Sequence, residues 1–287
     1  MPPAHPRRTD PRFEPLPVRR VEVCPQAEPL PAGRWPVAVP AVAQLLREGL
    51  DLGRSTVLVG ANGSGKSTLV EAIAMAFGLA PEGGSTGARH RTYPSESALS
   101  EALTLVRGPG GSRWGYFVRA ETLHGLVGYL DASRADSLHT NDPSFHTLSH
   151  GESFRALLDT RRFAGPGLFV LDEPEAGLAF EAQLTLVGQL VDLAARRGCQ
   201  VLLATHSPVV AALPGARILE LGPWGMRPTS WDRLDAVDHW RRFLADPRRY
   251  LRHLLPEPGA PDRADQSTRS RARSRIGDEW VSPPTER

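Results

Sequence analysis

The middle of the chain alternates short apolar runs with segments in which apolar residues recur every three or four positions. Four runs, each bounded by polar or glycine-containing stretches, predict buried strands at 55–60, 168–171, 201–204 and 217–221. Helical spacing predicts helices over 66–77 and 178–197, and Gly198 is a suitable residue to end the second. Buried strands that alternate with helices indicate an α/β fold, with a parallel or mixed sheet flanked by helices.

Proline marks the ends of the ordered region. Of the 27 prolines, 11 lie in residues 1–40 and five in residues 256–287. We therefore expect a disordered arm over 1–17, one domain over 18–255 that starts with a strand at 18–23, and a disordered tail over 256–287. The stretch 88–165 is more polar, and it predicts an inserted, mostly helical subdomain.

Composition narrows the function classes. The 287 residues carry a formal net charge of +2, and the tail 256–287 balances six arginines with six carboxylates, so a nucleic-acid partner is not supported. Two cysteines, Cys24 and Cys199, cannot form a disulfide framework. The sequence has neither an apolar run long enough for a membrane span nor a signal-peptide core. We expect a cytoplasmic protein that does not insert into membranes.

A glycine-rich segment between the strand at 55–60 and the helix at 66–77 matches the pattern G-x-x-x-x-G-K-[ST]. It predicts an ATP-binding loop made of Gly60, Ala61, Asn62, Gly63, Ser64, Gly65, Lys66, Ser67 and Thr68. Backbone N–H groups would cradle the phosphates, Lys66 would meet the β- and γ-phosphates, and Ser67 would bind Mg²⁺. Lys66 is the one lysine among 34 basic residues, which fits a role that arginine cannot fill.

Two further motifs follow buried strands. Asp172 and Glu173 come directly after the run at 168–171, where Asp172 would hold Mg²⁺ through its water shell and Glu173 would activate the attacking water. His206 follows the run at 201–204. Because parallel strands end at the same edge of a sheet, we expect His206 near Glu173 and the phosphates, as a sensor of the γ-phosphate.

The segment LSHGES at 148–153 has two compatible interpretations. Ser149 and Glu152 form a capping box that opens a helix over 154–159. The same residues resemble the LSGGQ signature of ABC-type ATPases, in which a helix N-terminus meets the γ-phosphate bound by another subunit. A capped helix N-terminus binds anions, so either interpretation allows the other.

Taken in order, GANGSGKST, LSHGES, LFVLDEPEAGL and ATHSP resemble the ABC-type ATPase superfamily of P-loop NTPases. More narrowly, they resemble a bacterial group of stand-alone AAA-family ATPases with an SHGES signature. The segments RAETLHGLVGY at 119–129 and WRRFLADPRRYLRHLL at 240–255 resemble that group as well, the second as its closing helix. The resemblance covers residues 20–255.

The resemblance implies an ATP-dependent head-to-tail homodimer with two ATP molecules sandwiched between the chains. Each nucleotide would be contacted by Ser149 and Gly151 of the other chain, and the segment 175–178 would cross the interface. Some residues depart from the superfamily pattern. His150 and Glu152 replace signature residues, and no glutamine lies between Lys66 and Ser149 to serve as the usual Q-loop residue.

For two positions of the expected site, the sequence offers two candidate residues each. Arg119 and Glu121 are the candidates for the Q-loop position. Phe13 and Trp35 are the candidates for the aromatic ring that would stack on adenine.

The function expected first is a Mg²⁺-dependent ATPase that acts by ATP-sandwiched dimerisation on an unidentified target. The alternatives are a DNA-maintenance ATPase, the ATP-binding subunit of a transporter, and a nucleotide-gated switch with negligible turnover. The missing Q-loop glutamine argues against the transporter subunit, because that loop normally couples to the membrane partner. Ser149 follows Lys66 by 83 positions, too few for the long coiled coils of many DNA-repair relatives, so the DNA-maintenance alternative requires a compact relative without a coiled coil.

Overall fold

The computed structural model describes residues 14–86, 98–123, 125–128, 130, 144–148, 150–252 and 254. The chain divides into two compact units, Met1–Ala236 and Val237–Arg287. The first unit is built on a seven-stranded sheet of order β10-β9-β3-β8-β7-β6-β4. Its strands are β3 (Ser55–Gly60), β4 (Gly84–Ser85), β6 (Gly115–Arg119), β7 (Gly167–Asp172), β8 (Cys199–Thr205), β9 (Arg217–Gly222) and β10 (Gly225–Thr229).

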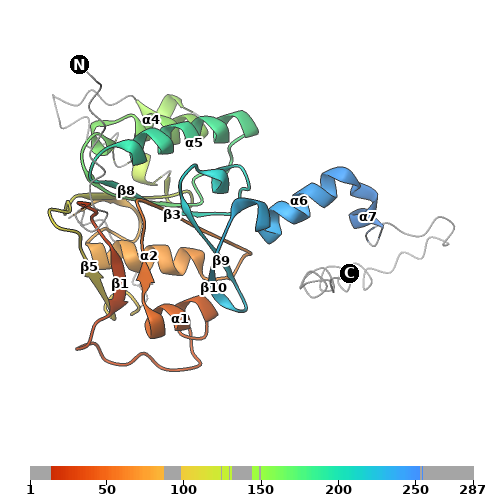
Figure 1. Ribbon diagram of the computed structural model, residues 1–287. Helices are drawn as coiled ribbons and strands as arrows, with labels where there is room; N and C mark the ends of the chain where they lie inside the picture. Colours follow the sequence, from red (N-terminus) through yellow and green to blue (C-terminus); the bar gives the residue numbers. More distant parts are fainter. Residues whose placement is uncertain are drawn as a thin grey trace, which may run out of the picture. The chain divides into compact units, whose positions relative to one another are not determined.

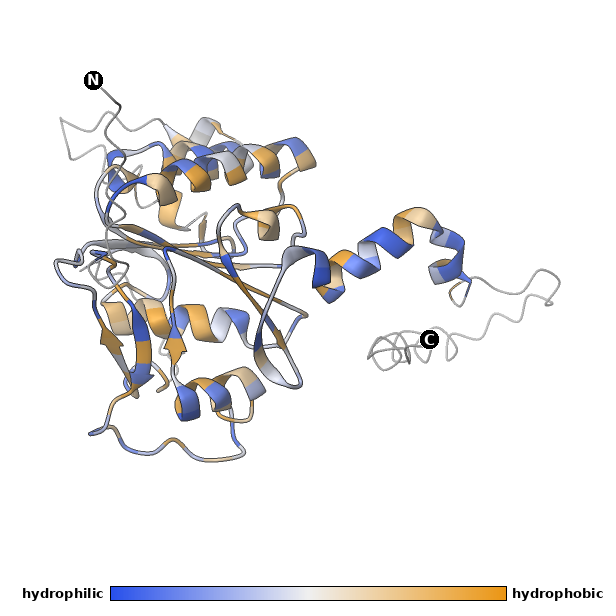
Figure 2. Cartoon of the chain, in the orientation of Figure 1, coloured by the Kyte–Doolittle hydropathy of each residue, from blue (hydrophilic) through white to orange (hydrophobic). Residues whose placement is uncertain are grey.

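The five central strands are parallel, and antiparallel β10 and β4 close the two edges. Their residues are buried along most of their length because helices cover both faces, and Figure 2 shows these strands as mostly hydrophobic. The expected α/β fold with a parallel or mixed sheet is confirmed.

One face of the sheet is covered by α1 (Pro40–Glu48), α2 (Lys66–Phe77) and a second, three-stranded sheet (Figure 1). That small antiparallel sheet has the order β2-β1-β5, with β1 at Arg20–Val23, β2 at Leu50–Asp51 and β5 at Leu103–Val106. The main core cluster joins side chains of α2, such as Leu69 and Ile73, to Leu58 and Val170 of the large sheet.

The other face carries α4 (His150–Leu158) and α5 (Phe180–Ala195) (Figure 1). Aromatic side chains fill part of this layer: Phe163 stacks on Phe169 of β7 with ring centroids 5.0 Å apart, and it contacts Tyr116 of β6 at 5.2 Å. The described residues also form four short 3₁₀ turns: η2 (Phe145–Thr147), η3 (Arg161–Phe163), η4 (Val210–Ala212) and η5 (Trp231–Arg233).

The predicted strands and helices agree closely with the observed elements. The strand at 55–60 and the helix at 66–77 have the bounds of β3 and α2, and the other three strand predictions lie within β7, β8 and β9. The helix predicted at 178–197 is α5, which begins at Phe180 and ends at Ala195. The helix predicted at 154–159 begins earlier, because α4 starts at His150.

The inserted, mostly helical subdomain expected over 88–165 stays a prediction; the described part of that stretch contains α4 and also the strands β5 and β6, which the sequence did not predict. β6 pairs with β7 in parallel and is buried, so packing against the sheet determines its conformation. The expected disorder of 1–17 is wrong for residues 14–17, since Leu16 is buried and its carbonyl accepts a hydrogen bond from Gly108 N at 2.9 Å. Residues 1–13 and the tail expected at 256–287 lie outside the described residues.

The second unit contains most of α6 (Asp235–Ala245) and all of α7 (Pro247–Leu251). The single closing helix expected over 240–255 is thus interrupted between Ala245 and Pro247. Pro247 starts a helix readily, and the Asp246 carboxylate caps α7 by accepting from the N–H groups of Arg248 and Arg249. Within the described part of the chain, we find no helix with the length and apolar character needed to cross a bilayer.

Candidate active site

The predicted ATP-binding loop connects the end of β3 to the start of α2. Gly65 caps α2 with a left-handed backbone, φ 96°, and a Cβ atom there would lie 2.5 Å from Val39 Cγ1. At Gly60 a Cβ atom would lie 2.6 Å from the Leu221 carbonyl oxygen. Both positions therefore require glycine, and the loop can turn back closely over the first turn of α2.

Lys66 points back into this loop. Its side chain is buried, and Nζ donates hydrogen bonds to the carbonyl oxygens of Gly60, at 3.0 Å, and Ala61, at 3.3 Å. The same Nζ lies 2.7 Å from His206 Nε2. Burial lowers the pKa of the Lys66 ammonium, and the carboxylates of Glu173, Asp172 and Glu175 oppose that shift. The site holds a desolvated cation among carboxylates.

Asp172 ends β7 beside the start of α2. Its Oδ1 accepts a hydrogen bond from Ser67 Oγ at 3.1 Å, and its Oδ2 lies 3.5 Å from Arg119 Nε. Burial raises the pKa of this carboxyl to about 6, against the opposing effects of Arg119 and Ser67. Ser67 and Asp172 are thus adjacent, as expected for two residues that would bind one metal ion.

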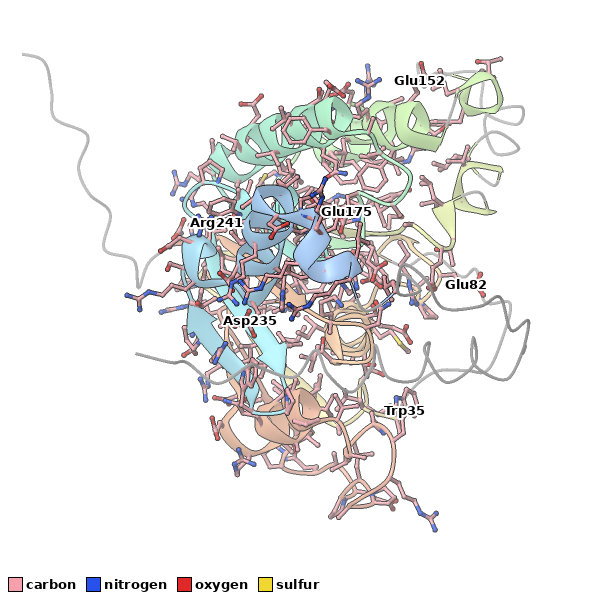
Figure 3. The ribbon with its side chains drawn as sticks, turned by 90° about the vertical axis from the view of Figure 1, so that its right-hand side faces the viewer. Trp35, Glu82, Glu152, Glu175, Asp235 and Arg241 are labelled. Atoms are coloured by element: carbon pink, nitrogen blue, oxygen red, sulfur yellow. The ribbon has the colours of Figure 1, made fainter. Side chains whose placement is uncertain are left out.

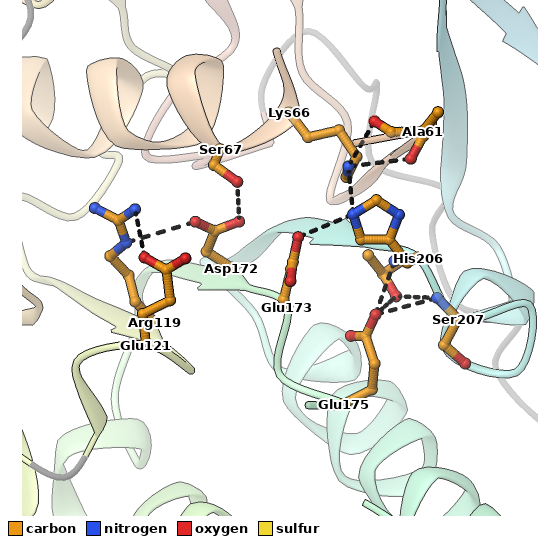
Figure 4. A network of polar contacts seen from close by, with 12 residues as sticks. Ala61, Lys66, Ser67, Arg119, Glu121, Asp172, Glu173, Glu175, His206 and Ser207 are labelled. Carbon is orange, nitrogen blue, oxygen red and sulfur yellow. Dashed lines mark hydrogen bonds and ion pairs between the residues drawn. The ribbon is translucent and has the colours of Figure 1, made fainter. Parts of the chain in front are cut away.

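Glu173 follows Asp172 in a strained conformation. Its φ of 51° is left-handed, which is rare for a residue other than glycine, asparagine or aspartate, and its N–H donates to the Ala204 carbonyl at 2.9 Å. Its Oε1 lies 2.9 Å from His206 Nε2, so the expected proximity of these two residues is confirmed (Figure 4).

Two side chains lie within hydrogen-bond distance of His206 Nε2. The Lys66 ammonium requires a lone pair on this nitrogen, whereas the Glu173 carboxylate requires a hydrogen on it. One ring nitrogen cannot satisfy both at once. The three side chains therefore form a polar cluster whose hydrogen bonds are incomplete.

Glu175 holds the backbone of the His206 segment in place. Its Oε1 accepts three hydrogen bonds, from Thr205 Oγ1 at 2.6 Å, His206 N at 2.7 Å and Ser207 N at 3.1 Å (Figure 4). Ser207 Oγ is in turn bonded to Gln183 Oε1 of α5 at 2.5 Å. The segment after β7, the end of β8 and α5 are thereby joined through polar contacts.

The structure brings together the five predicted side chains Lys66, Ser67, Asp172, Glu173 and His206. Gly151 in the first turn of α4 packs on the segment after Glu173, since a Cβ atom there would lie 2.5 Å from Leu178 Cδ2. Ser149 lies outside the described residues.

One of the two candidates for an adenine ring partner lies among the described residues. Phe13 lies outside the described residues, and Trp35 precedes α1 with 61% of its surface exposed. Figure 3 shows Trp35 and Glu152 of α4 on opposite sides of the sheet. Val39, four residues after Trp35, is the side chain that packs on Gly65 of the ATP-binding loop.

Two residues of the site were missed or not interpreted in the sequence. The sequence predicts Glu175 only as part of an interface segment, and nothing local to it indicates that it binds the His206 backbone. Glu71 of α2 binds Arg119 at 2.6 Å. It stands four residues after Ser67, so it lies on the same helix face, and this spacing could have indicated it.

Asp172→Asn is expected to stabilise the Mg²⁺-free protein, and more so at neutral than at acidic pH. Because the pKa of the native carboxyl is raised to about 6, the native state keeps its proton in a pH range where the unfolded chain loses it. The free energy of unfolding therefore falls as the pH rises from about 4 to about 6, by about 2 kcal/mol in total. Asparagine does not ionise, so the free energy of unfolding of the variant does not fall in this way.

Chemical denaturation in EDTA at about pH 7.5 and about pH 4.5 measures the effect. The advantage of Asp172→Asn should be about 2 kcal/mol larger at the higher pH. Equal advantages at both pH values would contradict the raised pKa.

Comparison with known proteins covers the region that contains this site. A family model described as "AAA domain, putative AbiEii toxin, Type IV TA system" matches residues 55–151 and 139–212, which together are more than half of the chain. Among curated proteins, the zinc import ATP-binding protein ZnuC of Chelativorans sp. (strain BNC1) is 34% identical over 190 residues, 61% of this chain and 58% of the relative. ZnuC of Vibrio cholerae is 32% identical over 170 residues, 56% of this chain and 60% of the relative.

The matched region thus spans about three fifths of the length of these relatives. Two solved structures show weaker similarity. A structure described as an inward-facing conformation of a "putative metal-chelate type ABC transporter" has 20% identity and a TM-score of 0.40, covering 67% of this chain and 80% of that one. The SMC head domain from Thermotoga maritima has 17% identity and a TM-score of 0.38, covering 63% and 93%.

The matched residues 55–212 run from β3 through the ATP-binding loop, the Asp172–Glu173 pair and His206. The two curated relatives are named as ATP-binding proteins. The chain belongs to the AAA-domain family described above.

Proposed function

We propose that this protein is an ATP-hydrolysing enzyme of the ABC-type P-loop class. It would require Mg²⁺ and hydrolyse ATP at the carboxyl edge of the large sheet, and two chains would close on two ATP molecules to do so. The observation that carries the proposal is the convergence of Lys66, the Ser67–Asp172 pair and the Glu173–His206 pair at the ends of three neighbouring parallel strands. We also propose that one ATPase domain extends over residues 18–255, with the signature segment in an insertion over 88–165.

The ATP-binding loop fits a polyphosphate. Side chains are excluded at Gly60 and Gly65, so backbone N–H groups at the N-terminus of α2 are available to an anion. Ser64 Oγ is buried and has no hydrogen-bond partner among the described residues. A bound phosphate would supply an acceptor for Ser64 and for the desolvated Lys66 ammonium.

The residues also fit a hard divalent cation. Hydroxyl and carboxylate oxygens are the protein ligands that Mg²⁺ prefers, and Ser67 Oγ and Asp172 Oδ1 lie 3.1 Å from each other. Ser67 would bind the ion directly and Asp172 would bind its water shell. When bound, Mg²⁺ neutralises negative charge on the β- and γ-phosphates.

Glu173 and His206 would act on the water that attacks the γ-phosphate. Glu173 is held in its left-handed conformation beside His206, so its carboxylate has a fixed position from which to orient the water and accept its proton. His206 would donate from Nε2 to a γ-phosphate oxygen, while Lys66 turns to the same phosphate. ATP would thus resolve the competition of Lys66 and Glu173 for one ring nitrogen.

The dimer would bring the N-terminus of α4 to the nucleotide of the other chain. In support, α4 starts at His150 within the signature segment, and Glu152 lies in its first turn. Gly151 packs against Leu178, which is five residues after Glu173, so the signature helix and the Glu173 segment of one chain are in direct contact. Ser149 and Gly151 would complete the partner's phosphate site.

The test is the mass of Glu173→Gln in solution, measured by light scattering with and without Mg²⁺-ATP. This variant should bind ATP but hydrolyse it slowly, so we expect a shift from monomer to dimer that requires ATP. Adding Ser149→Arg should abolish the shift, because a large cation would stand at the helix N-terminus. If ATP is bound and the mass does not change, the dimer mechanism is wrong.

A second candidate function is the ATP-binding subunit of a transporter, which the similarity to the ZnuC proteins favours. Such a subunit would bind a membrane protein and would be recovered with it from membranes. Retention of the chain in a detergent-purified complex with one integral membrane protein would support this function. A chain that is recovered without such a partner and dimerises by itself with ATP would favour the first proposal.

A further inference from the structure

A partly buried arginine lies beside the proposed metal-binding carboxylate. Arg119 ends β6 and is the register partner of Asp172 at the end of β7. The Ala120 N–H donates to the Asp172 carbonyl at 3.1 Å, which continues the pairing by one residue. The two side chains thus emerge together at the edge of the sheet that carries the site (Figure 4).

Arg119 is held mainly by a partner other than Asp172. Its Nη1 donates to Glu71 Oε2 at 2.6 Å and to the Pro81 carbonyl at 3.4 Å. Its Nε lies 3.5 Å from Asp172 Oδ2 and has no hydrogen-bond partner among the described residues. The interaction with Asp172 is therefore one of charge, and it leaves the Asp172 carboxylate free to bind other groups.

The low exposure of both side chains makes the charge of Arg119 act strongly on Asp172. The Arg119 side chain is 16% exposed and that of Asp172 is 6% exposed, so water screens their interaction weakly. Glu121 also lies near Arg119, at 3.6 Å, but its side chain is 83% exposed, and its effect is screened. Arg119 is thus a fixed positive charge between the partly buried carboxylate of Glu71 and the buried carboxylate of Asp172.

We infer that Arg119 acts as a permanent counter-cation for Asp172, which makes ATP binding less dependent on Mg²⁺. Without a metal ion, an uncompensated Asp172 would repel the phosphates in the adjacent loop. Arg119 offsets this repulsion before Mg²⁺ binds. It is a positioning residue for the Asp172 charge. The inference rests on the proposed function, because it takes Asp172 as the residue that faces Mg²⁺ and ATP.

The test is the dissociation constant of ATP, measured by calorimetry in Mg²⁺ and again in EDTA. The ratio of the EDTA value to the Mg²⁺ value reports how strongly ATP binding depends on the metal. In Arg119→Gln the ratio should rise about tenfold, as expected for loss of a unit charge roughly 10 Å from the phosphates in a protein-like dielectric. Arg119→Lys keeps the charge and should stay within about threefold of wild type.

Two further variants separate the local charge from the total charge and from misfolding. Arg107→Gln also removes one arginine, but Arg107 packs on Phe77 at the far end of α2, so its ratio should not change. Glu71→Gln removes a negative charge beside Arg119 and should lower the ratio. This opposite shift tests the inference even if Arg119→Gln does not fold.

The outcomes distinguish the inference from the proposed function. If wild-type protein binds ATP but the ratio is unchanged in Arg119→Gln, the inference is overturned and the proposed function stands. Where Arg119→Gln does not fold, an unchanged ratio in Glu71→Gln has the same meaning. If wild-type protein binds ATP in neither buffer, the proposed site is wrong, and the inference fails with it. If the ratio rises as much in Arg119→Lys as in Arg119→Gln, the shape of the guanidinium group matters and its charge does not. That result would also overturn the inference.

Discussion

Lys66→Met is expected to lower the affinity for ATP by about 100-fold, the effect of removing one member of a desolvated charge pair. Lys66 is buried in the ATP-binding loop, where its ammonium would be the nearest protein charge to the phosphates. The fold should tolerate the change. Burial lowers the pKa of Lys66, so the native state disfavours its charge, and methionine fills a similar volume without one. Calorimetry with Mg²⁺-ATP and thermal unfolding measure the two effects.

Lys66→Arg is the informative companion variant. It keeps the charge, but the guanidinium is larger and planar, whereas the space around Nζ is set by the carbonyl oxygens of Gly60 and Ala61 and by His206. We expect ATP binding to be lost as in Lys66→Met. Near-normal binding by Lys66→Arg would mean that a positive charge alone suffices and that the single lysine of this chain has no special role.

Glu173→Gln is expected to lower ATP turnover by about 10²–10³-fold while leaving ATP affinity within a few-fold of wild type. Glutamine has the size of glutamate but cannot accept the proton of the attacking water. Phosphate release under single-turnover conditions measures the chemical step directly. The matched control is Glu181→Gln, an exposed carboxylate in the first turn of α5, which should keep wild-type turnover. If Glu173→Gln retains more than about a tenth of the turnover, another group is the base.

The sequence predicts those parts of the fold whose signals are local. β3 and α2 have the predicted bounds because a buried apolar run, a glycine-rich loop and a helical apolar stripe follow one another within 23 residues. The proximity of Glu173 to His206 was predictable too, since both residues follow parallel strands and such strands end at one edge.

The remaining features depend on partners distant in the sequence. β6 is only five residues long and is a strand because β7 pairs with it. β10 contains Pro228, which argues against a strand in the sequence, and it is accommodated because β10 is an edge strand. The contacts of Glu175 with the His206 backbone and of Glu71 with Arg119 span 31 and 48 residues, so the partners of these two carboxylates could not be predicted from the sequence around them.

The left-handed backbone at Glu173 has a consequence for the evolution of this chain. Glycine or asparagine would adopt that conformation at lower cost, by about 1 kcal/mol or more. Selection for stability alone would therefore replace the glutamate. Where the activity is not needed, mutations of Glu173 to glycine or asparagine would be favoured. On the role proposed for Glu173, a glutamate retained at this position in a lineage would indicate that the activity is still used, and a glycine there would indicate that it is not.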